Sequence, residues 1–192
     1  MRTNSGDVYS VLFIAMFLRR GLLLSLLVAV YLSSAAGEAQ LEFPQPEGYV
    51  NDFANVIDAG AKKRLEALCK EVNEKTHGQI AVVTIGSPEG TPIGDYARLM
   101  FNNWGIGYKD DNRGMLILLA ITDHMYYISV GRGFEPLFPN DRVAVIGSEM
   151  VPLLRQRHYS KAALLSAGKI AGIIADERGV TLTTLKAGST VR

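Results

Sequence analysis

The chain has 192 residues, the length of one ordinary domain or two very small ones. It carries 20 Lys and Arg against 19 Asp and Glu, so it lacks the surplus of cations that general nucleic-acid binding needs. A composition of 48% hydrophobic and 20% charged residues is globular rather than disordered. The single cysteine excludes an intramolecular disulfide framework and a multi-thiolate zinc site. We therefore expect a globular domain that does not bind nucleic acid.

The N-terminal segment has the layout of a secretory signal. A basic pair, Arg19 and Arg20, precedes an apolar core, and small residues follow it up to Ala36. The apolar runs on either side of the basic pair are each shorter than the ~20 residues that a membrane-spanning helix needs. We predict that residues 1–36 are a signal peptide, that Met16 is the true start, and that the mature domain is periplasmic or extracellular with no membrane span. An uncleaved N-terminal anchor is the alternative.

The remaining chain divides into an extended lead-in at 37–48, a folded domain at 49–178 and a loosely held polar tail at 179–192. Apolar periodicity and turn residues predict the elements of the domain. In chain order they are a short strand or turn at 50–57, a helix at 61–76 with Asp58 as N-cap and Gly78 as C-terminal stop, a strand at 80–85, a helix at 91–104, a hairpin of strands 115–121 and 126–130, and helices at 139–156 and 159–176. This order predicts an α/β fold, a single compact α/β/α sandwich with a small mixed sheet flanked by helices.

The sequence offers no familiar nucleophile. No nucleophile-elbow or Walker A motif occurs, and Cys69 lies on the apolar face of its predicted helix. Covalent catalysis is therefore not indicated.

Acidic loops are the strongest chemical feature. Asp110, Asp111 and Asn112 stand just before the central strand, and Glu135 follows the returning strand of the hairpin, which ends at the same side. Asp52 joins them if the first segment docks there. Carboxylate and carbonyl oxygens from several loops are the ligands that Ca²⁺ or Mg²⁺ prefers, so the sequence predicts a divalent-cation site. The alternative is that these side chains are solvated turn residues.

Five segments in order resemble the TPM domain family over about Tyr49 to Asp176. They are Asn51-Asp52-Phe53-Ala54-Asn55-Val56-Ile57, Gly78-Gln79-Ile80-Ala81-Val82-Val83-Thr84, Trp104-Gly105-Ile106-Gly107, Asn112-Arg113-Gly114-Met115-Leu116-Ile117-Leu118 and Val130-Gly131-Arg132-Gly133-Phe134-Glu135.

The resemblance implies an exported α/β sandwich. Some members of the family are described as acid phosphatases, some as photosystem repair factors and some as receptor auxiliary proteins, and several hold a divalent cation in a shallow acidic cleft. By carry-over, the cation ligands would include Asp52, Asp111 with Asn112, and Glu135. The sequence departs from the family pattern where Arg157-His158 precedes Tyr159 in place of the usual acidic residue.

Three functions remain open at this point. The first is an envelope module that binds a partner protein in assembly or repair through the cation-holding cleft. The second is a weak metal-assisted acid phosphatase that hydrolyses a phosphorylated substrate, with Arg113 or Arg132 binding the phosphate. The third is a structural envelope protein whose loops are stiffened by calcium.

Overall fold

The structure is a computed structural model that describes residues 41–188; the predicted signal peptide and the start of the lead-in lie outside these residues. Its centre is a four-stranded sheet in the order β1-β2-β3-β4. The strands are β1 (Val50–Asp52), β2 (Gln79–Ile85), β3 (Gly114–Ala120) and β4 (Met125–Val130). The pairings β1–β2 and β2–β3 are parallel and β3–β4 is antiparallel, so the sheet is mixed as predicted.

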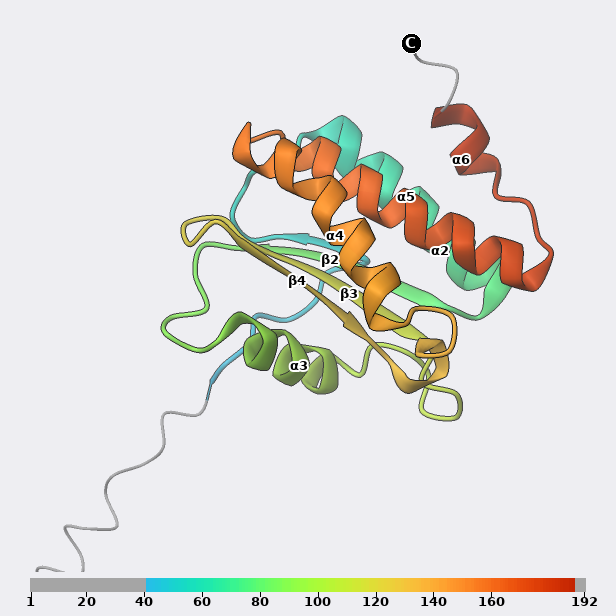
Figure 1. Cartoon of the computed structure of the whole chain (residues 1–192), viewed down its shortest axis with the longest axis horizontal. Coiled ribbons are helices and arrows are strands. Elements are labelled where there is room, and N and C mark those ends of the chain that lie inside the picture. The colour runs from blue at the N-terminus through green and yellow to red at the C-terminus, as the bar shows by residue number, and fades with distance from the viewer. Residues whose placement is uncertain (1–40, 189–192) are drawn as a thin grey trace, which may run out of the picture. The chain divides into compact units, whose positions relative to one another are not determined.

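Helices cover both faces of the sheet. The helices are α2 (Ala59–Thr76), α3 (Ile93–Trp104), α4 (Asn140–Arg155), α5 (Tyr159–Arg178) and the short α6 (Thr183–Gly188), with a 3-10 turn, η1 (Arg132–Phe134), after β4. Figure 1 shows α2, α4 and α5 on one face of the sheet and α3 on the other. The predicted α/β sandwich is confirmed. Within residues 41–188, no helix is both long enough and apolar enough to cross a membrane.

The two central strands explain why the sheet forms where it does. All seven residues of β3 and six of the seven of β2 are buried, as expected for parallel strands covered on both faces. Their register pairs Gln79 with Gly114 and Ile85 with Ala120, so the two strands begin and end together. Side chains such as Leu116 and Ile117 are fully buried, and each contributes about 1.5–3 kcal/mol by leaving water.

Helix α2 has the predicted N-cap and ends at Thr76 as predicted, but the left-handed residue that follows it is not the expected one. Asp58 is the N-cap, and its side chain accepts a hydrogen bond from the Ala61 amide at 2.8 Å. At the other end the left-handed residue is His77, with φ of 58°, and not the expected Gly78. Gly78 serves a different purpose, since a Cβ there would lie 2.7 Å from the Phe134 ring.

The tail also differs from expectation, because residues 181–184 are held against α2. The buried Glu71 carboxylate accepts hydrogen bonds from the amides and hydroxyls of Thr183 and Thr184 at 2.6–2.9 Å, and from Lys75 Nζ at 2.7 Å. Burial of Glu71 opposes its ionisation, but the hydrogen bonds from Lys75, Thr184 and Thr183 outweigh it and hold the pKa of Glu71 well below its usual range. The sequence does not indicate that the tail is ordered, because the residue that holds it, Glu71, lies over a hundred positions away in the chain.

Glu71→Gln should destabilise the protein by about 2 kcal/mol at neutral pH, since charge-assisted hydrogen bonds to a buried carboxylate are lost. Because the folded-state pKa is lowered, this stability is present above the ordinary Glu pKa of about 4.3 and is lost as pH falls below it. Urea unfolding at pH 7 and pH 3 should therefore show a wide gap between wild type and variant that narrows in acid. Glu74→Gln, in an exposed pair with Lys70 at 3.7 Å, is the control and should change stability by under about 0.5 kcal/mol.

Candidate metal site

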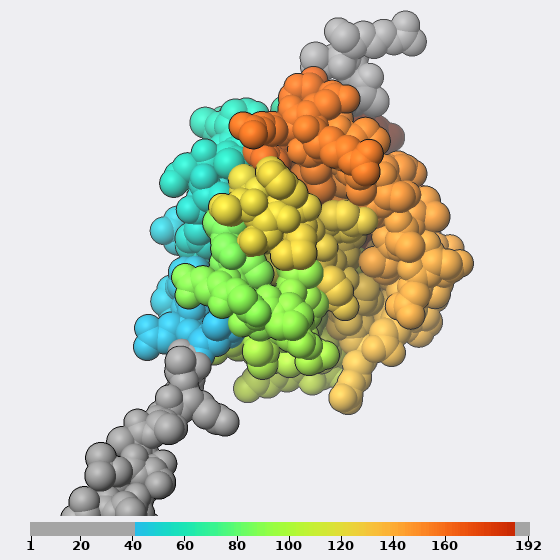
Figure 2. Space-filling model, turned by 60° about the vertical axis from the view of Figure 1, so that its left-hand side comes forward, coloured from blue at the N-terminus to red at the C-terminus, as the bar shows by residue number. Residues whose placement is uncertain are grey.

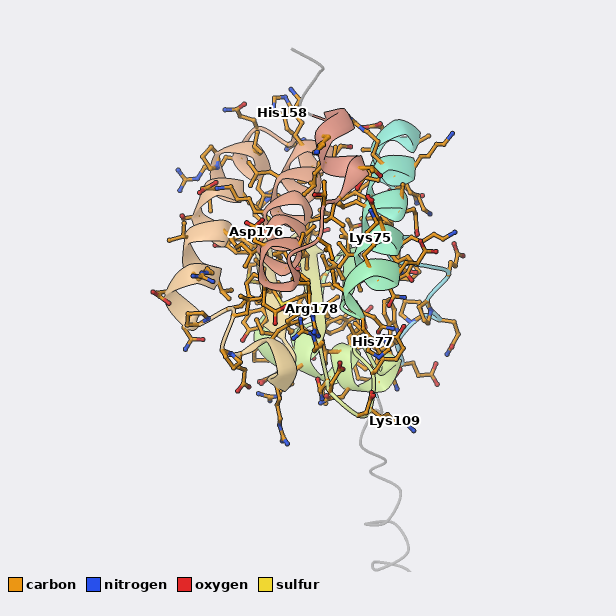
Figure 3. The ribbon with its side chains drawn as sticks, turned by 90° about the vertical axis from the view of Figure 1, so that its right-hand side faces the viewer. Lys75, His77, Lys109, His158, Asp176 and Arg178 are labelled. Carbon is orange, nitrogen blue, oxygen red and sulfur yellow. The ribbon has the colours of Figure 1, made fainter. Side chains whose placement is uncertain are left out.

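Two loops meet at the edge of the sheet where β2 and β3 begin. His77 and Gly78 come just before β2, and Asp110 and Asp111 come before β3, so the parallel register brings the side chains of His77, Asp110 and Asp111 together. One ligand atom of each, an imidazole nitrogen or a carboxylate oxygen, lies within 4.8 Å of the others. Figure 3 faces this end of the domain and shows His77 and Lys109 in its lower part. His77 and Asp110 are exposed and Asp111 is half-buried, so the cluster is open to solvent.

The imidazole of His77 is held in place by its neighbours. Its ring stacks on Tyr108 with centroids 3.7 Å apart and planes 6° from parallel. The Tyr108 hydroxyl donates to Asn73 Oδ1 at 2.8 Å, and Asn73 Nδ2 donates to the Tyr49 hydroxyl at 2.7 Å. This chain of contacts fixes the ring toward the loop of Asp110 and Asp111.

That loop is shaped by two residues with left-handed backbone. Gly107 has φ of 88° and Asn112 has φ of 50°, which are conformations that glycine and asparagine tolerate best. The Asn112 amide donates to the Tyr108 carbonyl at 2.7 Å, and the Gly107 amide donates to Gln79 Oε1 at 2.7 Å. Asp111 Oδ1 accepts from the Arg113 amide at 3.2 Å, which leaves its other oxygen available to a ligand. The loop is therefore built to present two carboxylates.

The segment after β4 supports the loop from behind. The Gly133 amide donates to the Asn112 carbonyl at 3.1 Å. A Cβ on Gly133 would collide with the Asp111 carbonyl, and one on Gly131 would collide with the Asn112 carbonyl. Both glycines are required because backbone packs directly on backbone here.

Arg113 anchors the same loop to α5. Its guanidinium donates to both carboxylate oxygens of Glu177, at 2.8 and 3.4 Å, and lies 4.5 Å from the centroid of the Phe134 ring. The hydrogen bond from Arg113 holds the pKa of Glu177 below its usual range. Only 11% of the Arg113 side chain is exposed, so this cation serves the fold and is not free to hold a phosphate.

The predicted ligands separate into two groups. Asp110 and Asp111 lie together, with Asn112 beside them as the left-handed residue of the loop. Asp52 is not brought to this edge: it pairs in register with Thr84, near the opposite end of β2, and its carboxylate accepts hydrogen bonds from the Thr84 hydroxyl and the Val56 and Ile57 amides. The first strand is only three residues long and pairs with the second half of β2, which accounts for this placement.

Glu135 and Arg132 flank the site rather than enter the cluster. Glu135 is exposed and lines a different cavity of about 840 Å³ between β4, α3 and α4. Arg132 is exposed between the two glycines that support the loop. It is the better placed of the two predicted phosphate-binding arginines.

His77 was not among the ligands predicted from the sequence. A signal was available, because residues preceding two adjacent parallel strands must meet at one edge of the sheet. The sequence pattern marks His77 only as the end of α2, which it is, although it also stands just before β2 as Asp111 stands just before β3.

One imidazole and two carboxylates form a donor set that divalent cations accept. Zn²⁺ takes nitrogen and oxygen ligands, whereas Ca²⁺ and Mg²⁺ prefer oxygen alone. Three protein ligands also leave coordination positions for water or a substrate oxygen. The residues therefore fit a bound cation, with His77 as the ligand that discriminates between metals.

Gly133→Ala should push the Asp111 carbonyl away and distort the loop. We expect a loss of about 1–3 kcal/mol in the free energy of unfolding, together with weaker cation binding in a titration. Gly168→Ala, in α5, is the control: its new Cβ would lie 3.7 Å from the Leu185 side chain of α6, an ordinary contact, and should stabilise the helix by about 0.5–1 kcal/mol. Equal cation affinity in wild type and Gly133→Ala would contradict the supporting role of the glycine.

Comparison with known proteins places the chain in a family. The TPM domain profile matches residues 50–173. The solution structure of an N-terminal domain from P. gingivalis is similar, with a TM-score of 0.65, 18% identity, and coverage of 73% of this chain and 97% of that one. An N-terminal domain from Corynebacterium glutamicum has a TM-score of 0.55 and 16% identity over 76% of this chain and 91% of that one.

The BA42 protein of Bizionia argentinensis has a TM-score of 0.55 and 18% identity, covering 62% of this chain and 82% of that one. At these identities the three structures establish the fold alone. No curated protein sequence matches the chain with significant similarity. Since the family profile spans most of the chain, this protein belongs to the TPM domain family.

Proposed function

We propose that this protein is an exported TPM domain that binds a divalent cation through His77, Asp110 and Asp111 and uses the metal-held loop to engage a partner protein in the cell envelope. The observation that carries the proposal is the convergence of three ligand atoms within 4.8 Å from the starts of two adjacent strands. Export rests on the signal-like segment up to Ala36.

Preorganisation supports cation binding over solvated turns. The Tyr108 stack positions His77, and the Arg113 amide positions Asp111. Metal ligands are commonly oriented by such outer contacts, which raise affinity by fixing the ligand before the ion arrives. Solvated turn carboxylates would need neither contact.

The loop is also suited to a partner. Lys109 and Asp110 are exposed at its tip, and Tyr108 is only half-buried. A cation that joins the end of α2 to this loop would rigidify the exposed surface, which lowers the entropy cost of binding a second protein there.

His77→Asn tests the metal site with little disturbance of the backbone, because asparagine accepts the left-handed conformation of His77. Calorimetric titration should show Zn²⁺ or Mn²⁺ affinity falling more than about tenfold, and Asp111→Asn should weaken every divalent cation. His124→Asn is the matched control, since His124 has a similar φ of 55° and follows β3 at its other end.

If Ca²⁺ or Mg²⁺ affinity is unchanged in His77→Asn but lost in Asp111→Asn, the ligands are the loop carboxylates alone and His77 is not one of them. The proposal would be refuted if titration with Zn²⁺, Mn²⁺, Ca²⁺ and Mg²⁺ gave neither a heat of binding nor a rise in melting temperature. A ligand that binds only the folded state must stabilise that state.

Metal-assisted hydrolysis of phosphomonoesters is the second candidate function. The feature that favours it is the open coordination of a three-ligand site, beside which Arg132 is exposed and could hold a phosphate. A cation here would supply polarisation of a phosphoryl oxygen and activation of water.

If the protein is a phosphatase, Arg132→Gln should lower kcat/KM on p-nitrophenyl phosphate by roughly tenfold or more, since a charge-assisted hydrogen bond to the phosphate is removed. Arg98→Gln, an exposed arginine on α3, is the matched charge control. Absence of metal-dependent turnover in the wild type would leave the binding function as the proposal.

A further inference from the structure

A second cavity lies at the opposite end of β3 from the candidate metal site. Its volume is about 470 Å³, and it opens between the β3–β4 turn and the connection from α4 to α5. Figures 1 and 2 place the yellow end of the hairpin beside the orange end of α4 on one face of the domain. The lining residues are Leu119, Ala120, Ile121, His124, Met125, Tyr126, Val151, Leu154, Arg155, Arg157 and Tyr159.

The inner surface of the cavity is apolar. Leu119 and Ala120 belong to the buried central strand, and Val151 and Leu154 face them from α4. A cavity of this size falls in the range that holds small organic molecules. Its floor would accept a hydrocarbon chain or ring.

The rim is cationic. His124, Arg155 and Arg157 are exposed around the opening, Tyr159 adds a hydroxyl, and no residue in the lining is Asp or Glu. Within residues 41–188 neither Arg155 nor Arg157 makes a side-chain ion pair or hydrogen bond, in contrast to Arg113 and Arg98. Two unpaired guanidinium groups at the mouth of an apolar cavity are suited to an oxyanion.

The start of α5 adds to this positive potential. The helix has 20 residues, its N-cap His158 makes no side-chain cap, and its first turn contains no acidic residue. Its free amides therefore carry partial positive charge near Tyr159. One acid touches this turn: the Asp58 amide donates to Ser160 Oγ, and the Asp58 carboxylate caps α2 through the Ala61 amide. The same carboxylate also interacts with the Ser160 hydroxyl, which holds the pKa of Asp58 below its usual range and offsets part of the positive potential at Ser160.

The backbone at the rim is strained at two of its residues. Arg157 has φ of 58° and His124 has φ of 55°, in the left-handed region where glycine would fit without steric cost. Strain of this kind, kept at a ligand-sized cavity, points to a role for the side chains themselves.

We propose that this cavity binds an amphiphilic anion. A carboxylate or phosphate monoester group would be held by Arg155, Arg157 and the amino end of α5, and an attached hydrocarbon chain would lie against Leu119, Val151 and Leu154. This site shares no residue with the candidate metal site, so the proposal does not depend on the function proposed above.

Fluorescence titration of the purified protein with anilinonaphthalene sulfonate, an amphiphilic anion, tests the proposal. We expect saturable binding to one site that is displaced by decanoate or by decyl phosphate. Comparing these two competitors assigns the preferred head group. Decyltrimethylammonium, with the same chain and a positive head, should displace the probe poorly, and inorganic phosphate alone should compete weakly because it lacks the chain.

Arg157→Gly separates binding from folding, because it removes the cation and relieves the backbone strain together. Probe affinity should fall roughly tenfold, as expected for a lost charge-assisted hydrogen bond, while the melting temperature of the free protein stays equal or rises. Arg155→Gln should weaken binding in the same way. Arg98→Gln, which removes an arginine from α3 away from the cavity, should leave affinity unchanged.

Three results would overturn the proposal. They are the absence of saturable probe binding, equal competition by decanoate and decyltrimethylammonium, and unchanged affinity in both Arg155→Gln and Arg157→Gly. The His77→Asn variant should bind the probe normally, which keeps the outcome separate from that of the metal site.

Discussion

The parallel pairing of β2 with β3 is the constraint on which the rest of the structure depends. Seven residue pairs run in register from Gln79–Gly114 to Ile85–Ala120, almost entirely buried. Because the strands begin together, the residues before them, His77 and Asp111, must meet. Because β3 turns back at its far end, the β3–β4 turn comes to lie beside the end of α4. The β2–β3 pairing therefore creates the polar edge, and the hairpin that continues β3 forms part of the apolar cavity at the opposite end.

Charge is distributed unevenly between these two ends, although the chain as a whole is nearly neutral. At the metal-site end, Arg113 is ion-paired with Glu177 and lies against Phe134, so this arginine does not neutralise the Asp110 and Asp111 carboxylates, while Arg132 stays exposed beside the loop. At the cavity end, Arg155 and Arg157 have no such acidic partner among the described residues. Net charge alone would conceal both binding surfaces, because pairing and not composition decides which charges are available to a ligand.

Much of the fold follows from the sequence because its signals are local. Buried apolar runs marked the two central strands, and Asp58 marked the start of α2. The site was predicted only in part, since Asp110, Asp111 and Asn112 stand together in the chain while His77 joins them through sheet register. The role predicted for Gly78 differs for the same reason: α2 ends at Thr76 as expected, but Gly78 is required by the distant Phe134 ring and not by helix termination. Likewise, no residue near Thr183 in the sequence indicates that Thr183 hydrogen-bonds to Glu71.

Non-glycine residues with left-handed backbone lower the local stability of this fold at specific places. His77 and Asn112 border the candidate metal site, and His124 and Arg157 border the cavity, so four of the non-glycine residues with positive φ stand at the two proposed binding surfaces. A fold selected for stability alone would place glycine there, as it does at Gly105 and Gly179, where helices α3 and α5 end. Asparagine tolerates this conformation, but the imidazoles of His77 and His124 and the guanidinium of Arg157 are held there against a backbone cost, which ligands that these groups bind would offset.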